Sequence, residues 1–182
     1  MKFTVVLLAV SLSTAFAIGQ RRVADLDPGH AAALKAFLSS NKEYGFLSES
    51  VLGPKYLKEM RRSFRAIRPY YNAGDYNNDG VIDFAMILSR KGERRDKGEG
   101  MAETHRYDHP LAVIIFNGDR RGRFRKAFIE DIGAPWVCFL NTETVKRKKK
   151  LYFGVFEADS DTRIFSPSGK GYIVKYPDEP EN

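Results

Sequence analysis

The clearest chemical pattern in this chain lies in residues 74–83, where oxygen-bearing side chains occupy every second position from 75 to 79 and return at 83. Asp75, Asn77 and Asp79 alternate with other residues. A glycine follows Asp79 directly, and Asp83 comes four residues after Asp79. Calcium takes about six to eight oxygen ligands at roughly 2.3–2.6 Å, and a short loop supplies them by turning alternate side chains inward. The segment therefore predicts a calcium-binding loop.

The predicted ligands fill the first, third, fifth, seventh and ninth positions of such a loop. They are Asp75, Asn77, Asp79, the backbone carbonyl of Val81, and Asp83 directly or through water. The twelfth position, where an EF-hand places a bidentate glutamate, is Met86, and the residues around it are typical of a strand. The loop is therefore not an EF-hand. Without the bidentate ligand we expect a modest affinity, with a Kd of about 10⁻⁴ to 10⁻³ M, and a structural Ca²⁺ ion.

The pattern Asp-x-Asn-x-Asp-Gly-x-x-Asp, followed by an apolar strand, resembles the calcium loops of FG-GAP and VCBS repeats. The resemblance covers residues 74–88 and implies a structural calcium ion in a loop between two strands, held by the five residues named above. A propeller needs several repeats, whereas this loop occurs once, so a propeller is excluded. The chain as a whole resembles small exported bacterial proteins of unassigned activity.

A plain turn is the alternative for the same segment. In that case the Asp and Asn side chains accept hydrogen bonds from their own backbone and hold no ion. Carboxylates brought close together repel each other, and a divalent cation between them removes that cost, which favours calcium.

The N-terminal residues have the three parts of a secretory signal, which we predict over residues 1–17. A lysine follows Met1, residues 3–12 are largely apolar, and Ala15-Phe16-Ala17 is a small-x-small cleavage site. The apolar run is shorter than the roughly 20 residues that a membrane span needs. We therefore expect export to the periplasm or the extracellular space, with residues 18–182 forming one domain.

Charge is the second global signal, since 30 Lys and Arg residues against 23 Asp and Glu residues give +7. The basic residues cluster around 55–68, 90–97, 120–126 and 146–150. Such clusters are typical of solvated helix faces and loops. The alternative is binding to an anionic envelope polymer or to lipid head groups. No motif of a nucleic-acid reader accompanies the clusters, so we do not expect nucleic acid as a partner.

The fold prediction combines two N-terminal helices with later strands. Asp27 and Pro28 start a helix that runs to Ser39, and the segment from Gly53-Pro54 to Pro69 has apolar residues at helical spacing. The remaining segments are short and rich in β-branched or aromatic residues: Val81–Leu88, Leu111–Phe116, Phe124–Ile132, Val137–Leu140, Leu151–Phe156, Thr162–Phe165 and Tyr172–Tyr176. We expect an α+β fold, with two N-terminal helices packed on one antiparallel sheet of about five to seven strands. The long link 91–109 is expected to be a mobile loop.

Enzyme motifs are weak. His105 and His109 have the spacing of a zinc pair on a helix, but a proline follows at once. Carboxylate candidates for a hydrolase have no spacing that selects a pair: Glu103, Asp108, Glu130 and Glu157. The single Cys138 lies in an apolar segment and is expected to be a buried core residue, and His30 a surface or capping residue. We therefore predict a non-enzymatic, monomeric protein, with a hydrolase as an alternative.

Overall fold

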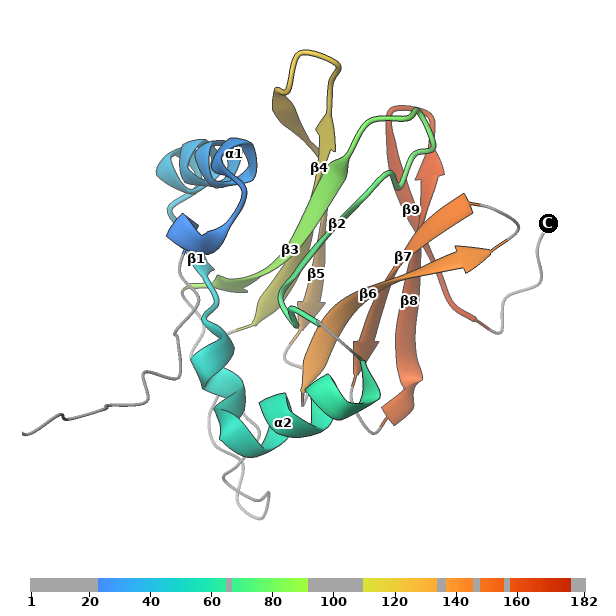
Figure 1. The fold of residues 1–182 in the computed structure, drawn as a ribbon. Coiled ribbons are helices and arrows are strands. Elements are labelled where there is room, and N and C mark those ends of the chain that lie inside the picture. The colour runs from blue at the N-terminus through green and yellow to red at the C-terminus, as the bar shows by residue number, and fades with distance from the viewer. Residues whose placement is uncertain are drawn as a thin grey trace, which may run out of the picture.

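The computed structural model describes residues 23–64, 67–91, 110–133, 137–145, 148–155 and 158–177. Within these ranges it contains two α-helices, two short 3-10 helices and nine strands (Figure 1). Their order is η1 (Val23–Asp25), α1 (Pro28–Ser40), β1 (Tyr44–Phe46), η2 (Glu49–Leu52), α2 (Gly53–Ser63), β2 (Tyr71–Gly74), β3 (Asp83–Arg90), β4 (Leu111–Gly118), β5 (Phe124–Gly133), β6 (Cys138–Val145), β7 (Lys148–Val155), β8 (Ala158–Ser168) and β9 (Gly171–Lys175). Three predictions concern residues outside these ranges. They are the signal peptide, the pair His105 and His109, and the loop 91–109 beyond its first residue.

The strands form two antiparallel sheets. The first sheet has the order β1-β3-β4-β5, and β2 also pairs with β3. β2 and β1 share the same edge, because β2 pairs with Asp83–Met86 of β3 and β1 with Leu88–Arg90. The second sheet has the order β6-β7-β8-β9. From β6 to β9, each strand pairs antiparallel with the next strand in the chain, which is the arrangement that short links favour.

The predicted α+β arrangement of two helices on one sheet is wrong. The described chain is mostly β, with two sheets packed face to face, and only α1 covers a sheet face. Continuous apolar runs in the sequence indicate strands buried on both faces, but they do not specify whether helices or a second sheet provide the cover. The strands assigned to one sheet are in fact divided between two layers.

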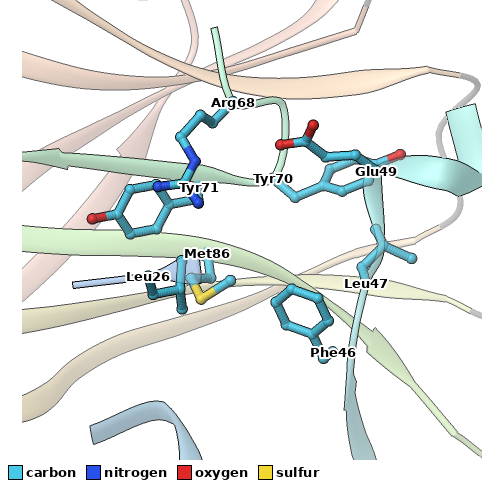
Figure 2. Close-up of a pocket in the computed structure, with 8 residues that line it drawn as sticks. All are labelled: Leu26, Phe46, Leu47, Glu49, Arg68, Tyr70, Tyr71 and Met86. Carbon is cyan, nitrogen blue, oxygen red and sulfur yellow. The ribbon is translucent and has the colours of Figure 1, made fainter. Parts of the chain in front are cut away.

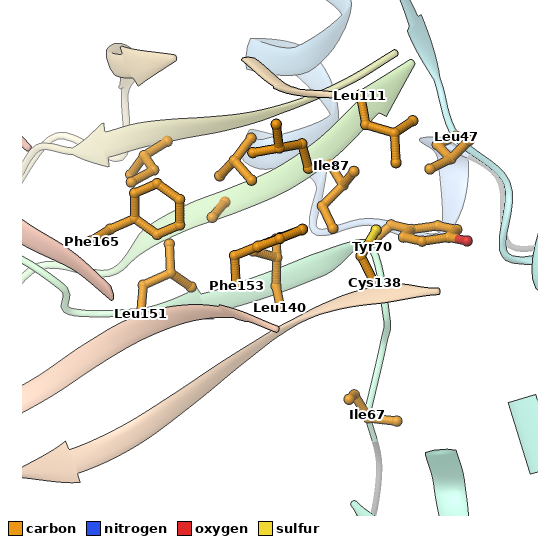
Figure 3. Packing of buried hydrophobic residues seen from close by; sticks show 14 of the residues in the cluster. Leu47, Ile67, Tyr70, Ile87, Leu111, Cys138, Leu140, Leu151, Phe153 and Phe165 are labelled. Atoms are coloured by element: carbon orange, nitrogen blue, oxygen red, sulfur yellow. The ribbon is translucent and has the colours of Figure 1, made fainter. Parts of the chain in front are cut away.

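The first sheet is the middle layer of the molecule, because the two faces of β3 and β4 are buried against different partners. Phe84, Met86, Leu88, Ile114 and Phe116 pack under α1 together with Leu34. The alternate residues, Ala85, Ile87, Leu111, Val113 and Ile115, pack against the second sheet. The side chains opposite them are Leu140, Leu151, Phe153, Phe165 and Tyr172, several of which are visible in Figure 3. This two-sided burial explains why β3 and β4 are apolar almost throughout.

Helix α1 begins as the sequence predicts. The Asp27 side chain caps the helix by accepting a hydrogen bond from Gly29 N at 2.9 Å, and Pro28 occupies the first turn. His30 is only 5% exposed, so the expectation of a surface residue is wrong. Its ring stacks on Phe84 with the centroids 4.4 Å apart, and its Nδ1 lies 2.7 Å from the Tyr71 hydroxyl oxygen. An aromatic ring at this position therefore helps to hold α1 on the first sheet.

Helix α2 lies across one end of the sandwich and does not cover a sheet face (Figure 1). Leu57 and Met60 are buried in the cluster between the sheets, whereas Lys55, Lys58 and Arg62 are exposed. The helix ends at Ser63, earlier than predicted, because the next residue already has an extended backbone. Since its apolar face is used by the core, α2 cannot lay that face on a membrane. Neither helix of the described chain is long and apolar enough to cross a bilayer.

Candidate metal loop and its anchors

The predicted metal loop connects β2 to β3 at the upper end of the sandwich in Figure 1. β2 and β3 pair antiparallel up to Gly74 opposite Asp83, so the loop closes a hairpin. Two of its residues have left-handed backbone angles, Asn78 with φ of 60° and Gly80 with φ of 82°. Glycine and asparagine tolerate this region best, which explains why they occupy these positions. β3 continues through Met86, so the prediction that a strand and not a helix follows the loop is confirmed.

Side-chain oxygens of the first three predicted ligands gather around the backbone N–H groups of the loop. Asp79 N donates to both Asp75 Oδ1 at 3.1 Å and Asn77 Oδ1 at 3.0 Å. Gly80 N donates to Asp75 Oδ2 at 3.0 Å, and Val81 N donates to Asp79 Oδ1 at 2.8 Å. These bonds fix the turn and bring the oxygens of Asp75 and Asn77 to the same nitrogen.

The amide of Asn77 also contacts Asp79. Asn77 Nδ2 donates to Asp79 Oδ2 at 2.9 Å, so a nitrogen and not an oxygen of the amide faces that carboxylate oxygen. In this arrangement the loop satisfies its own polar groups, as expected for a plain turn. Each oxygen that accepts one hydrogen bond retains a second lone pair, so the same side chains keep ligand capacity.

Asp83 is fully buried, and hydrogen bonds reach both of its carboxylate oxygens. Oδ2 accepts from Tyr76 N at 3.0 Å and from Asn77 N at 3.4 Å, and Oδ1 accepts from Gly118 N at 3.0 Å. The Tyr172 hydroxyl lies 3.4 Å from Oδ2. Burial raises the pKa of Asp83 above its ordinary value, and the backbone hydrogen bonds oppose that shift. Asp83 therefore ties the loop to β4 and β9.

Two buried tyrosines complete this network. The Tyr172 hydroxyl donates to Asn117 Oδ1 at 2.8 Å, and the Tyr76 hydroxyl donates to Asn72 Oδ1 at 2.9 Å. Burial raises the pKa of both phenols, and the negative charge of Asp83 raises it further. Both tyrosines therefore remain neutral hydrogen-bond donors at ordinary pH. The two hydroxyls thus hold side chains of β2, β3 and β4 in place.

Sequence reasoning identified the loop but missed the residues that anchor it. Gly118 and Tyr172 are 35 and 89 residues away from Asp83 in the chain, so no local spacing connects them. For Gly118 the structural reason is a close approach, because a Cβ there would lie 2.3 Å from the carbonyl oxygen of Ile82. The sequence marks this position only as part of the turn Asn117-Gly118-Asp119.

The five predicted ligands thus divide into two groups. Asp75, Asn77 and Asp79 share the backbone donors of the loop, and Val81 contributes its N–H to that set. Asp83 lies beneath them, bound to backbone donors. In the described part of the chain no group of three or more His, Cys, Asp or Glu side chains is close enough to hold a metal ion. Calcium also binds amide and main-chain carbonyl oxygens, which Asn77 and Val81 would supply here.

The other chemical candidates are not assembled into a site in the described residues. Glu130 lies 3.5 Å from Arg163 in an ion pair, while Glu103, Asp108 and Glu157 lie outside the described residues. Cys138 is fully buried in the core between the sheets, as predicted.

One small cavity lies between η1, β1, β2 and β3 (Figure 2). Its lining includes Leu26, Glu49, Arg68, Tyr71 and Met86, and the Arg68 guanidinium stacks over the Tyr71 ring at 4.4 Å. Its volume of about 10 Å³ is close to the minimum for one water molecule, so it cannot hold a substrate.

No family model, curated protein or solved structure matches this chain. The likeness to FG-GAP and VCBS loops therefore stays a prediction from residues 74–88.

Proposed function

We propose that this protein is an exported, non-enzymatic domain in which the 75–83 loop binds one structural Ca²⁺ ion. The observation that carries the proposal is the convergence of Asp75 and Asn77 oxygens on a single backbone N–H, that of Asp79. The oxygens of Asp75 and Asn77 are thus already held together, which lowers the conformational entropy that binding costs, whereas the three carboxylates of the loop have to move closer when an ion binds. The proposed ligands remain Asp75, Asn77, Asp79, the Val81 carbonyl and Asp83. The proposal of export depends on residues 1–17.

Electrostatics gives a second argument for a cation. The charge of Asp79 raises the pKa of Asp83, and the charges of Asp83, Asp79 and Asp75 all raise the pKa of Tyr172. Three carboxylates therefore act on the same small region of the protein. A divalent cation offsets this repulsion more effectively than the neutral Asn77 amide does.

The proposed role of the ion is to stabilise the upper end of the sandwich. Asp83 is bonded to Gly118 of β4 and lies beside Tyr172 of β9, so an ion that fixes Asp83 also fixes the contact between the two sheets. The expected Kd of about 10⁻⁴ to 10⁻³ M suits a site that is filled in calcium-rich surroundings. At 10 mM Ca²⁺ such a Kd stabilises the fold by about 1.4–2.7 kcal/mol.

The test is thermal unfolding in 10 mM CaCl₂ and in excess chelator, with MgCl₂ as the ion control. We expect calcium to raise the Tm by about 3–10 °C, because each kcal/mol shifts the Tm of a domain this size by about 2–4 °C. Asp79→Asn keeps an acceptor for Val81 N but removes a charge, so it should abolish most of the response.

Asp119→Asn is the matched control. Asp119 also accepts hydrogen bonds from turn N–H groups, those of Arg121 at 2.9 Å and Arg123 at 3.0 Å, but the Arg123 guanidinium already neutralises it. This variant should respond to calcium as the wild type does. Equal melting of the wild type in calcium and in chelator would contradict the proposal and leave the loop a plain turn.

A further inference from the structure

The hairpin between β4 and β5 carries the densest set of exposed cations in the described chain. We define the basic hairpin as Arg120, Arg121, Arg123, Arg125 and Lys126, all of which are exposed. Figure 1 shows the turn of this hairpin projecting above the neighbouring elements at the upper end of the molecule. A partner can therefore approach the tip from several sides.

The turn of the hairpin is held in one conformation by Asp119. Its Oδ1 accepts from Arg121 N and Arg123 N, and its Oδ2 lies 2.7 Å from the Arg123 guanidinium. The backbone adds a bond from Asp119 N to Arg123 O at 2.9 Å and one from Gly122 N to Asp119 O at 2.8 Å. The Arg123 hydrogen bonds lower the pKa of Asp119 to about 2, so this arrangement persists across physiological pH.

The base of the hairpin is fixed to the rest of the molecule. Gly118 is bonded to Asp83, and Asn117 to Tyr172. On the other side, the Phe124 ring packs edge-on against His30 with the centroids 4.6 Å apart. A rigid base and a rigid turn fix the backbone positions from which the cations project, which lowers the backbone entropy cost of binding a partner.

Four of the five cations are free to bind a ligand. Arg123 is used by the turn, but no carboxylate of the described residues pairs with Arg120, Arg121, Arg125 or Lys126. Helix α2 offers a weaker set, because Arg61 pairs with Glu49 and the helix also contains Glu59. Exposed arginines without partners are suited to sulfate and phosphate groups, which accept the two parallel N–H groups of a guanidinium.

We propose that the basic hairpin binds a linear anionic polysaccharide bearing sulfate or phosphate groups. Arg125 and Lys126 point to opposite faces of β5 because they are neighbours in a strand, so a chain with repeated anionic groups that crosses the turn and follows one face can contact Arg120, Arg121 and Arg125 at once. The turn 119–123 contains no aromatic residue for stacking on nucleic-acid bases, and Phe124 is packed beside His30. It also contains no apolar side chain that would enter a bilayer.

The experiment measures the Kd for heparin, a sulfated polysaccharide, at physiological salt, with neutral dextran as the negative control. Chelator is present throughout, so that the outcome does not depend on calcium in the 75–83 loop. The hairpin variant Arg120→Gln/Arg121→Gln/Arg125→Gln should weaken heparin binding by about 10- to 100-fold, because each exposed charge contact contributes about 0.5–1 kcal/mol. Its salt dependence should also become shallower.

The matched control removes three charges at the opposite end of the molecule with Lys55→Gln/Lys58→Gln/Arg62→Gln, and should change the Kd by less than about threefold. Equal losses in the two triple variants would overturn the proposal, because net charge alone would then explain binding. Equally tight, arginine-dependent binding to vesicles with anionic phospholipid or to duplex DNA would also overturn it. If the hairpin triple variant melts early, Arg120→Gln/Arg121→Gln decides the question, since neither side chain supports the turn.

Discussion

At the upper end of the sandwich, the neighbours of a residue in space restrict which side chain it can have. Gly118 has no side chain because the carbonyl oxygen of Ile82 occupies the place of its Cβ, at 2.3 Å. Its N–H also donates to the buried Asp83 carboxylate. One residue thus permits the close approach of two segments and stabilises a buried charge between them.

Gly118→Ala should therefore destabilise the protein by about 1–3 kcal/mol through overpacking, and by more if the hydrogen bond to Asp83 is lost. Urea unfolding monitored by circular dichroism measures the change in the free energy of unfolding. Gly122→Ala is the comparison, because a Cβ there meets open space and only the φ of 71° is strained. That strain costs about 1 kcal/mol. A smaller loss for Gly118→Ala than for Gly122→Ala would contradict the explanation.

At the scale of elements, α1 is attached to the first sheet by an aromatic contact that includes a titratable ring. His30 stacks on Phe84, and its Nδ1 lies 2.7 Å from the Tyr71 hydroxyl. Burial lowers the pKa of His30, while the negative charge of Asp27 opposes the shift. The Arg68 guanidinium, stacked on the Tyr71 ring, is a second charge near this contact. The folded state therefore favours neutral His30.

The sign of the pH effect follows from that lowered pKa. The contribution of neutral His30 is fully present above the unfolded pKa of about 6.5, and it is lost as the pH falls below that value, because the unfolded chain binds the proton more readily. The wild-type Tm should decrease as the pH is lowered from 7.5 to 5.5. His30→Phe keeps a ring on Phe84 and cannot titrate, so its Tm should fall less over the same range. Parallel curves for the two proteins would show that His30 does not control this dependence.

At the scale of the whole molecule, the first sheet is a shared middle layer. Its β3 and β4 have one face under α1 and the other against the second sheet. The amides of β3 and β4 lie between paired strands and under a covering layer on each face, so their exchange requires both the strand pairing and the packing to open. We therefore expect β3 and β4 to exchange their amide hydrogens most slowly, at a rate set by global unfolding.

Phe153→Ala tests that expectation from the second sheet. Phe153 is 1% exposed and packs in the cluster between the sheets. Its truncation should destabilise the fold by about 3–5 kcal/mol. Hydrogen exchange measured by mass spectrometry should then accelerate in β3 and β4 by about two to four orders of magnitude, although neither strand is mutated. Unchanged exchange in the first sheet would show that the two sheets unfold separately.

Local features of the fold and of the candidate site were accessible from the sequence alone. Asp27 and Pro28 start α1, Leu111–Phe116 lies within β4, and Met86 lies in a strand and not in an exiting helix. The alternating oxygens of Asp75, Asn77 and Asp79 also follow from residue type and spacing, because a loop of this length determines which side chains can meet. These features depend on contacts among residues close together in the chain.

The tertiary structure alone decided how the layers are arranged and what the loop is anchored to. An apolar run specifies that both faces of a strand are covered, but a helix and a second sheet bury it equally well, so one sheet was predicted where two exist. The same limit applies to Asp83, whose partners Gly118 and Tyr172 are brought to it by the pairing of β3 with β4 and the packing of the second sheet. Several arrangements of helices and strands satisfy the same local pattern. Burial between residues far apart in the sequence decides which arrangement forms, so only the tertiary structure shows it.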